Sequence, residues 1–219
     1  MDPLIFAPLN RIRYNQRSRA SRLGLTMNNN KKILIIFGSH KKNGNTAALI
    51  KRVCAGAKAK ATAIEIVNAA RLKFKITGCT SCRKCQQLKE YKCIINDGGS
   101  QVLLKMIAAD VIVFATPLYF FAASAPIKMV IDRMFSLYKW DNETDEFETP
   151  LRGKTLALIA SAYEDVGLAA LAKPFKLTAD YTEMKFKALL VPNAGVSGNL
   201  GSNVAVMKQA VRFGRGLAK

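Results

Sequence analysis

From Lys32 onward, short apolar runs alternate along the chain with stretches of helical periodicity. The runs contain few polar residues, which is typical of strands buried on both faces of a parallel sheet. We expect five such strands, at residues 32–37, 63–67, 111–115, 155–160 and 188–191. Strands and helices in alternation predict an α/β protein in which helices cover a parallel sheet.

Apolar residues between these runs recur at the spacing of a helix face. One set is Ile50, Val53, Cys54 and Ala57, and another is Ile127, Val130, Ile131, Met134 and Phe135. A last helix is predicted with Ser202 as its N-cap, and Ser124 is predicted to cap the helix that carries a Lys128–Asp132 pair. Residues 140–150 (WDNETDEFETP) are acidic and rich in turn residues, so we expect an exposed loop there.

The first 26 residues differ from the rest, because they carry five Arg, one acidic residue and no apolar periodicity. We interpret residues 1–26 as a basic, disordered extension and residues 27–219 as one domain. Half of the 219 residues are apolar, which is enough for one core. No apolar run approaches the roughly 20 residues that cross a bilayer, so no membrane association is expected.

A polar loop, Phe37-Gly-Ser-His-Lys-Lys-Asn-Gly-Asn-Thr46, joins the first strand to the first helix. Backbone N–H groups at a helix N-terminus, together with hydroxyl and amide side chains, form a site for a phosphate group. The loop lacks both the GxGxxG pattern and the GK[ST] ending of a P-loop, which disfavours a nucleoside triphosphate. The expected phosphate ligands are Ser39, Lys41, Asn43, Asn45 and Thr46. His40, the single histidine, is expected to face solvent.

Two motifs resemble the NADPH-dependent FMN reductase and iron–sulfur flavoprotein group of the flavodoxin-like superfamily. Gly38-Ser39 and Gly44-Asn45-Thr46 match the family's phosphate loop, and residues 115–133 (ATPLYFFAASAPIKMVIDR) look like its Pro-Val-Tyr-Phe loop and following helix. The resemblance extends from about residue 31 to the C-terminus and is weakest after Ala160. It implies a flavodoxin-like three-layer fold with a five-stranded parallel sheet in the order 2-1-3-4-5. It also implies FMN as cofactor, NAD(P)H as co-substrate, and a homodimer or homotetramer.

The loop after the third strand lies where open parallel sheets bind their ligands, beyond the carboxyl ends of the strands. Aromatic side chains there can lie against the isoalloxazine ring, and backbone amides can meet its polar edge. We expect contacts from Pro117, Leu118, Tyr119 and Phe120. No side chain is expected to be catalytic, because flavin chemistry resides in the cofactor.

Four of the five cysteines, Cys79, Cys82, Cys85 and Cys93, form a CxxCxxC pattern followed by a fourth thiol after seven residues. Thiolates at this spacing can bind one four-iron (4Fe–4S) cluster, as the resemblance to iron–sulfur flavoproteins also implies. A structural zinc ion and free thiols remain the alternatives. Crowded cysteines in a chain of this length favour a reducing compartment, so we expect a cytoplasmic protein.

The domain is strongly basic, with 29 basic and 14 acidic residues after the extension is set aside. Such a charge suits nucleic acid, an anionic membrane surface or phosphorylated small molecules. Only the charge supports a nucleic-acid binder, since no motif accompanies it, so we expect no nucleic-acid partner. The leading hypothesis is an oxidoreductase that passes electrons from NAD(P)H through FMN to a quinone, nitroaromatic, flavin or protein acceptor. The alternative is an electron carrier that uses FMN and a cluster without direct use of nicotinamide.

Overall fold

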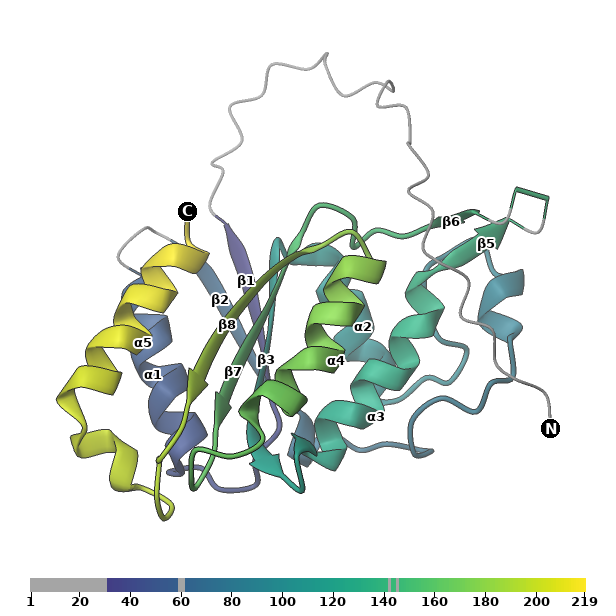
Figure 1. Ribbon diagram of the computed structural model, residues 1–219. Coiled ribbons are helices and arrows are strands. Elements are labelled where there is room, and N and C mark those ends of the chain that lie inside the picture. Colours follow the sequence, from purple (N-terminus) through teal and green to yellow (C-terminus); the bar gives the residue numbers. More distant parts are fainter. Residues whose placement is uncertain (1–30, 59–61, 142, 145) are drawn as a thin grey trace.

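The computed structural model describes residues 31–58, 62–141, 143–144 and 146–219, which form a sheet with helices on both faces (Figure 1). The strands of this sheet are β1 (Lys32–Phe37), β2 (Ala63–Asn68), β3 (Val111–Tyr119), β4 (Ala122–Ala123), β7 (Thr155–Ser161) and β8 (Lys185–Val191). Five of them run parallel in the order β2-β1-β3-β7-β8, and the short β4 pairs antiparallel with the end of β3. The predicted order is confirmed, with β7 and β8 as its fourth and fifth strands.

Two layers of helices cover the sheet (Figure 1). On one face lie α1 (Asn45–Lys58) and α5 (Val204–Leu217), and on the other lie α2 (Gly98–Ala108), α3 (Ala125–Arg133) and α4 (Leu168–Tyr181). Single 3-10 turns occur at η1 (Ala69–Arg71), η2 (Lys84–Gln87), η3 (Met134–Leu137) and η4 (Asn199–Ser202). Among the described residues, no helix has the length and apolar character needed to cross a bilayer.

The continuous apolar run of β1 follows from this arrangement. Ile33 and Ile35 pack in the core beneath α1 and α5, whereas Leu34 and Ile36 pack in the core beneath α2, α3 and α4. Successive side chains of a strand point to opposite faces, so a strand covered on both sides has no position for a polar residue.

Helices α1 and α5 touch through their backbones. A Cβ atom added to Gly56 would lie 2.1 Å from the carbonyl oxygen of Val211, and one added to Gly214 would lie 2.0 Å from that of Val53. Both distances are far inside van der Waals contact. Only glycine therefore allows this approach, which joins an early and a late segment of the chain into one layer.

The expectation of an exposed loop at residues 140–150 is wrong in part. The segment contains a short hairpin of β5 (Lys139–Asp141) and β6 (Glu146–Glu148). Trp140 pairs with Phe147 across the hairpin, with ring centroids 5.1 Å apart, and the Phe147 ring stacks on Tyr181 of α4. These aromatic contacts give the hairpin an apolar side that its acidic composition conceals.

Smaller differences concern the ends of elements. Asn203, and not Ser202, caps α5, because its Oδ1 accepts a hydrogen bond from the Val206 amide at 3.1 Å. Ser124 precedes α3, but its hydroxyl makes no capping bond and donates to the Gly38 carbonyl instead. The Lys128–Asp132 pair is confirmed at 2.6 Å. The predicted extension of residues 1–26 lies outside the described residues.

Candidate functional site

A cleft of about 170 Å³ opens at the carboxyl ends of β1, β3 and β7. The structure brings seven of the nine predicted cofactor ligands to its wall: Ser39, Lys41, Asn45, Thr46, Pro117, Leu118 and Tyr119. Asn43 and Phe120 are not part of the wall. Asn43 is exposed, and the Phe120 side chain is almost fully exposed. His40 is exposed, as expected.

Close packing at Gly38 fixes the start of the polar loop. Its amide donates to the Ala115 carbonyl at 2.8 Å, and its carbonyl accepts from the Ser124 hydroxyl at 2.7 Å. A Cβ atom at this position would lie 2.3 Å from Cγ1 of Ile127 and 2.4 Å from Oγ of Ser124. Gly38 thus holds the end of β1 against β3 and α3, and Ser39 follows directly into the cleft.

The first turn of α1 forms the polar end of the cleft. The Thr46 hydroxyl is buried and lies 3.3 Å from the hydroxyl of Ser161 at the end of β7. Ser39 Oγ accepts a hydrogen bond from the Lys41 amide at 3.2 Å. The first amides of a helix have no acceptor within it and carry the positive end of the helix dipole, so they favour an anion. Lys41 adds a formal positive charge to the same wall.

Asn45 connects the polar loop to a segment that the sequence did not indicate. Its Nδ2 donates to the carbonyls of residues 194, 195 and 196 at 3.0, 3.3 and 3.1 Å. Its Oδ1 accepts from the amides of Gly198 and Leu200 at 2.9 and 3.1 Å. Gly195 and Ser197 of this segment also line the cleft, so Asn45 builds one wall of it.

Aromatic side chains surround the other end of the cleft. Tyr119 and Tyr163 line it and are 54% and 64% exposed, so their rings are available to a ligand. The turn between β3 and β4 consists of Phe120 and Phe121, both with positive φ (44° and 63°). Positive φ is strained for bulky residues, and such strain is often concentrated at functional sites. A two-residue hairpin turn needs positive φ at both positions and favours Asn and Gly, so the use of two Phe residues here is the unusual feature.

The four clustered cysteines line a second, smaller cavity, as the sequence predicted that they would share one site. Cys79 and Cys82 are exposed, and Cys85 is buried. Gly78, Ser81 and Arg83 have positive φ, which gives the loop its tight course around the thiols. Within the described residues, no three His, Cys, Asp or Glu side chains already converge tightly enough to hold a metal ion.

The thiols of this cavity differ in acidity. Hydrogen bonds from the Lys84 amide and the Thr80 hydroxyl lower the pKa of Cys82. Burial raises the pKa of Cys85, and the Gln86 side chain, which donates to its sulfur at 3.6 Å, opposes that rise. Cys54 belongs to the core of the opposite layer, as predicted, and burial raises its pKa.

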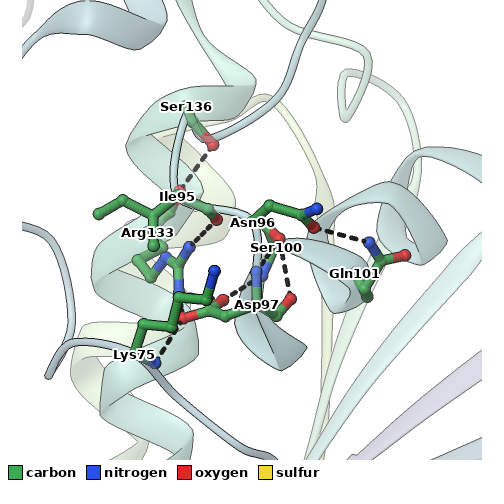
Figure 2. Close-up of polar contacts among 8 residues, drawn as sticks. All are labelled: Lys75, Ile95, Asn96, Asp97, Ser100, Gln101, Arg133 and Ser136. Atoms are coloured by element: carbon green, nitrogen blue, oxygen red, sulfur yellow. Dashed lines mark hydrogen bonds and ion pairs between the residues drawn. The ribbon is translucent and has the colours of Figure 1, made fainter.

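Arg133, which lines the cysteine cavity, forms a buried ion pair with Asp97. Figure 2 shows this pair and the polar contacts around it. Arg133 at the end of α3 donates from Nη1 to both carboxylate oxygens of Asp97 at 2.6 and 2.8 Å, and from Nη2 to the Ile95 carbonyl at 2.8 Å. Asp97 also caps α2, accepting from the Ser100 amide, and accepts from the Lys75 amide. Both charged side chains are only 1% exposed.

The third nitrogen of the Arg133 guanidinium, Nε, takes no part in these bonds. Nε is buried with no hydrogen-bond partner among the residues that the structure describes, and Arg133 is part of the cavity wall. Burial lowers the pKa of Arg133, but Cys93 and Asp97 raise it above its usual value. A buried N–H without an acceptor is costly, and a thiolate or cluster sulfur in the cavity would supply one.

The comparison with known families decides the assignment. A description of the NADPH-dependent FMN reductase family matches residues 31–201, which is well over half of the chain. The chain belongs to the NADPH-dependent FMN reductase family. The resemblance read from its two motifs is confirmed.

One curated relative and two solved structures extend this result. An iron–sulfur flavoprotein of Methanocaldococcus jannaschii is 32% identical to this chain over 102 residues. The match covers 47% of this chain and about half the length (51%) of that relative. An NAD(P)H:quinone oxidoreductase from Methanothermobacter marburgensis has a TM-score of 0.66 at 14% identity, with 86% of this chain and 99% of that chain covered. A flavodoxin from the domain Archaea has a TM-score of 0.52 at 12% identity, with 85% and 96% covered. These structures confirm the flavodoxin-like fold.

Proposed function

We propose that the cleft binds FMN and that the protein passes electrons from NAD(P)H to a second substrate. The observation that carries this proposal is the two-ended character of the cleft: hydroxyls and a helix N-terminus at one end, aromatic rings at the other. A phosphate group and a flat ring system are the two ends of FMN, so the residues fit this cofactor. Bound FMN would supply the hydride and electron transfer that no protein side chain provides.

The residues of the chain would hold and orient the cofactor. The hydroxyls of Ser39 and Thr46 would donate to the phosphate, and Lys41 would offset its charge. Pro117, Leu118 and Tyr119 would meet the ring from the end of β3 and keep water from one side of it. Asn43 and Phe120, which lie outside the wall, would contribute only if the loop and the turn close over the ligand.

The open, aromatic end of the cleft is the place where a nicotinamide and an electron acceptor would enter in turn. A quinone, a nitroaromatic compound or a free flavin each has a planar ring that suits exposed Tyr119 and Tyr163. We also propose a homodimer or homotetramer, because Phe120 and Phe121 add further exposed aromatic surface at this edge. Light scattering that gives the mass of one chain would contradict the oligomer.

A second candidate is an electron carrier with an iron–sulfur cluster, which the cysteine cavity supports. Four thiols line one cavity, and the orphaned Nε of Arg133 fits a sulfur acceptor. Cys79, Cys82, Cys85 and Cys93 would bind one four-iron cluster, with the loop closing to bring the sulfurs together. Iron and acid-labile sulfide would be measured on protein reconstituted under nitrogen. An iron content below about a tenth of that expected for one four-iron cluster per chain would contradict the cluster and leave a zinc site or free thiols as the alternatives.

One experiment tests the cofactor and separates the two candidates. Protein saturated with FMN is mixed with NADPH, and then with NADH, without oxygen, and the flavin absorbance is followed. Rapid bleaching supports the reductase, whereas a stable flavin band that only dithionite bleaches supports the carrier. Failure to bind FMN would refute both. Thr46→Val should weaken FMN binding by about 1 to 3 kcal/mol, and Thr155→Val, at the opposite end of β7, should leave it unchanged.

A further inference from the structure

The layer formed by α1 and α5 is a cationic face. Neither helix contains an acidic residue, and none occurs in residues 31–64 or 184–219. The exposed basic residues of the two helices are Lys51, Arg52, Lys58, Lys208, Arg212 and Arg215. On the opposite face, α3 and α4 each pair one lysine within the helix, as Lys128–Asp132 and Lys176–Asp180. The layer of α1 and α5 is therefore more positive than the facing layer of α3 and α4.

Four of these cations gather at one groove of about 360 Å³ between the helices. Arg52 comes from α1, while Lys208, Arg212 and Arg215 follow one another along α5 at helical spacing. The glycine contacts described above bring the two helices so close that these side chains share one groove. None of the four takes part in a salt bridge with another described residue.

Apolar side chains complete the groove. Val204, Met207 and Val211 line it, and Val204 is 65% exposed at the first turn of α5. An apolar strip bordered by arginine and lysine has the composition of a protein interface, where Arg and Met are enriched and a polar rim surrounds an apolar centre. Like charges grouped without a partner add nothing to the stability of the fold, so they point to an anionic ligand.

We propose that this groove is the docking site for an acidic amphipathic helix of a partner protein. The apolar side of such a helix would cover Val204, Met207 and Val211, as in other helix-in-groove complexes. Its Asp and Glu side chains would pair with Arg52 on one side and with Arg212 and Arg215 on the other. Arginine binds carboxylates with two parallel hydrogen bonds, which fixes the register of the partner as well as adding affinity.

Other occupants fit the groove less well. Neither α1 nor α5 exposes an aromatic side chain on which a nucleic-acid base could stack, because the one aromatic residue of the pair, Phe213, packs against the core. The apolar strip lies in a groove, where a flat bilayer surface does not reach. A second copy of this chain would have to insert its acidic β5–β6 hairpin into the groove. In that hairpin Trp140 and Phe147 already pack against Tyr181 of the same copy, so no apolar side is left for the groove.

Fluorescence anisotropy with a labelled synthetic peptide tests the proposal. The peptide is a helix with leucines at positions i, i+3, i+4 and i+7 and glutamates elsewhere, and the control peptide has the same composition with the leucines scattered. We expect the amphipathic peptide to bind roughly tenfold more tightly than the control, and less tightly as salt increases. Arg212→Glu should weaken binding at least about tenfold, whereas Lys173→Glu, an equal charge change at an exposed site on α4, should not.

The apolar contribution is tested separately with Val204→Ser and its matched control Leu177→Ser, an exposed apolar position on α4. Only Val204→Ser should weaken peptide binding. Equal affinity for both peptides, or equal effects of Arg212→Glu and Lys173→Glu, would overturn the groove as a specific site. Binding of duplex DNA or phosphatidylserine vesicles that Arg212→Glu abolishes, without peptide binding, would overturn it in favour of those partners. FMN content, measured on every variant, is expected to be unchanged, so this test is independent of the proposed reductase activity.

Discussion

Asn45 should contribute more to stability than any other side chain of the polar loop. It makes five hydrogen-bond contacts to residues 194–200, but its amide has only two N–H donors, so three contacts at Nδ2 share them. The contacts amount to about four full hydrogen bonds, and each contributes about 0.5 to 1.5 kcal/mol to stability. Two of the five contacts are exposed to solvent, so we expect a total in the lower part of the resulting range. We expect Asn45→Ala to lower the free energy of unfolding by about 2 to 3 kcal/mol.

Urea unfolding of the apoprotein, followed by circular dichroism, measures this effect. Asn45→Asp is the informative second variant, because its second carboxylate oxygen would face three carbonyl oxygens in place of the amide N–H groups. It should therefore be at least as destabilising as Asn45→Ala, although a carboxylate at a helix N-terminus is otherwise favourable. Asn43→Ala, an exposed neighbour, should change stability by less than about 0.5 kcal/mol. An Asn45→Ala protein as stable as Asn43→Ala would refute the reasoning.

Three further predictions concern other positions. Burial raises the pKa of Asp97, but amide hydrogen bonds and Arg133 lower it below its usual value. The ionised Asp97 carboxylate therefore stabilises the fold above about pH 4, and this stabilisation is lost as the pH falls through the folded-state pKa. Asp97→Asn should cost about 3 to 5 kcal/mol at pH 7 by leaving Arg133 unpaired, and urea unfolding at pH 7 and pH 3 should then differ less than in the parent protein. Gly38→Ala should cost about 1 to 3 kcal/mol by pressing on Ile127 and should weaken FMN binding; a fully stable variant would exclude the clash. Phe120→Asn should raise the free energy of unfolding by about 0.5 to 1 kcal/mol, since Asn tolerates positive φ, and a lower melting temperature would show that Phe120 is not strained.

Features encoded within a few neighbouring residues could be predicted from the sequence. The strands are continuous apolar runs, and β1 begins and ends at the predicted residues. The polar loop is equally local, because a strand end, two glycines and several hydroxyls occur within ten residues. Strand order followed from the family resemblance of these motifs and not from the runs themselves.

Features that depend on distant partners could not be predicted. The partners of Asn45 lie about 150 residues away, and nothing near Asn45 indicates them. The burial of Arg133 depends on Asp97, 36 residues earlier. The Asp97–Ser100 capping box was a local signal for the start of α2 that the sequence interpretation missed. Helix α4 was hidden by Pro174, which falls inside it.

The backbone contact of α1 with α5 has a consequence for how the protein is made. A ribosome extends the chain from its N-terminus at about 5 to 20 residues per second. Helix α1 is thus synthesised many seconds before Gly214, which it needs for its final packing. Until α5 leaves the ribosome, α1 lacks the helix that packs beside it. The α1–α5 layer beside the cofactor cleft can therefore be completed only after α5 has been synthesised, and a nascent chain that stalls before α5 would be a substrate for chaperones.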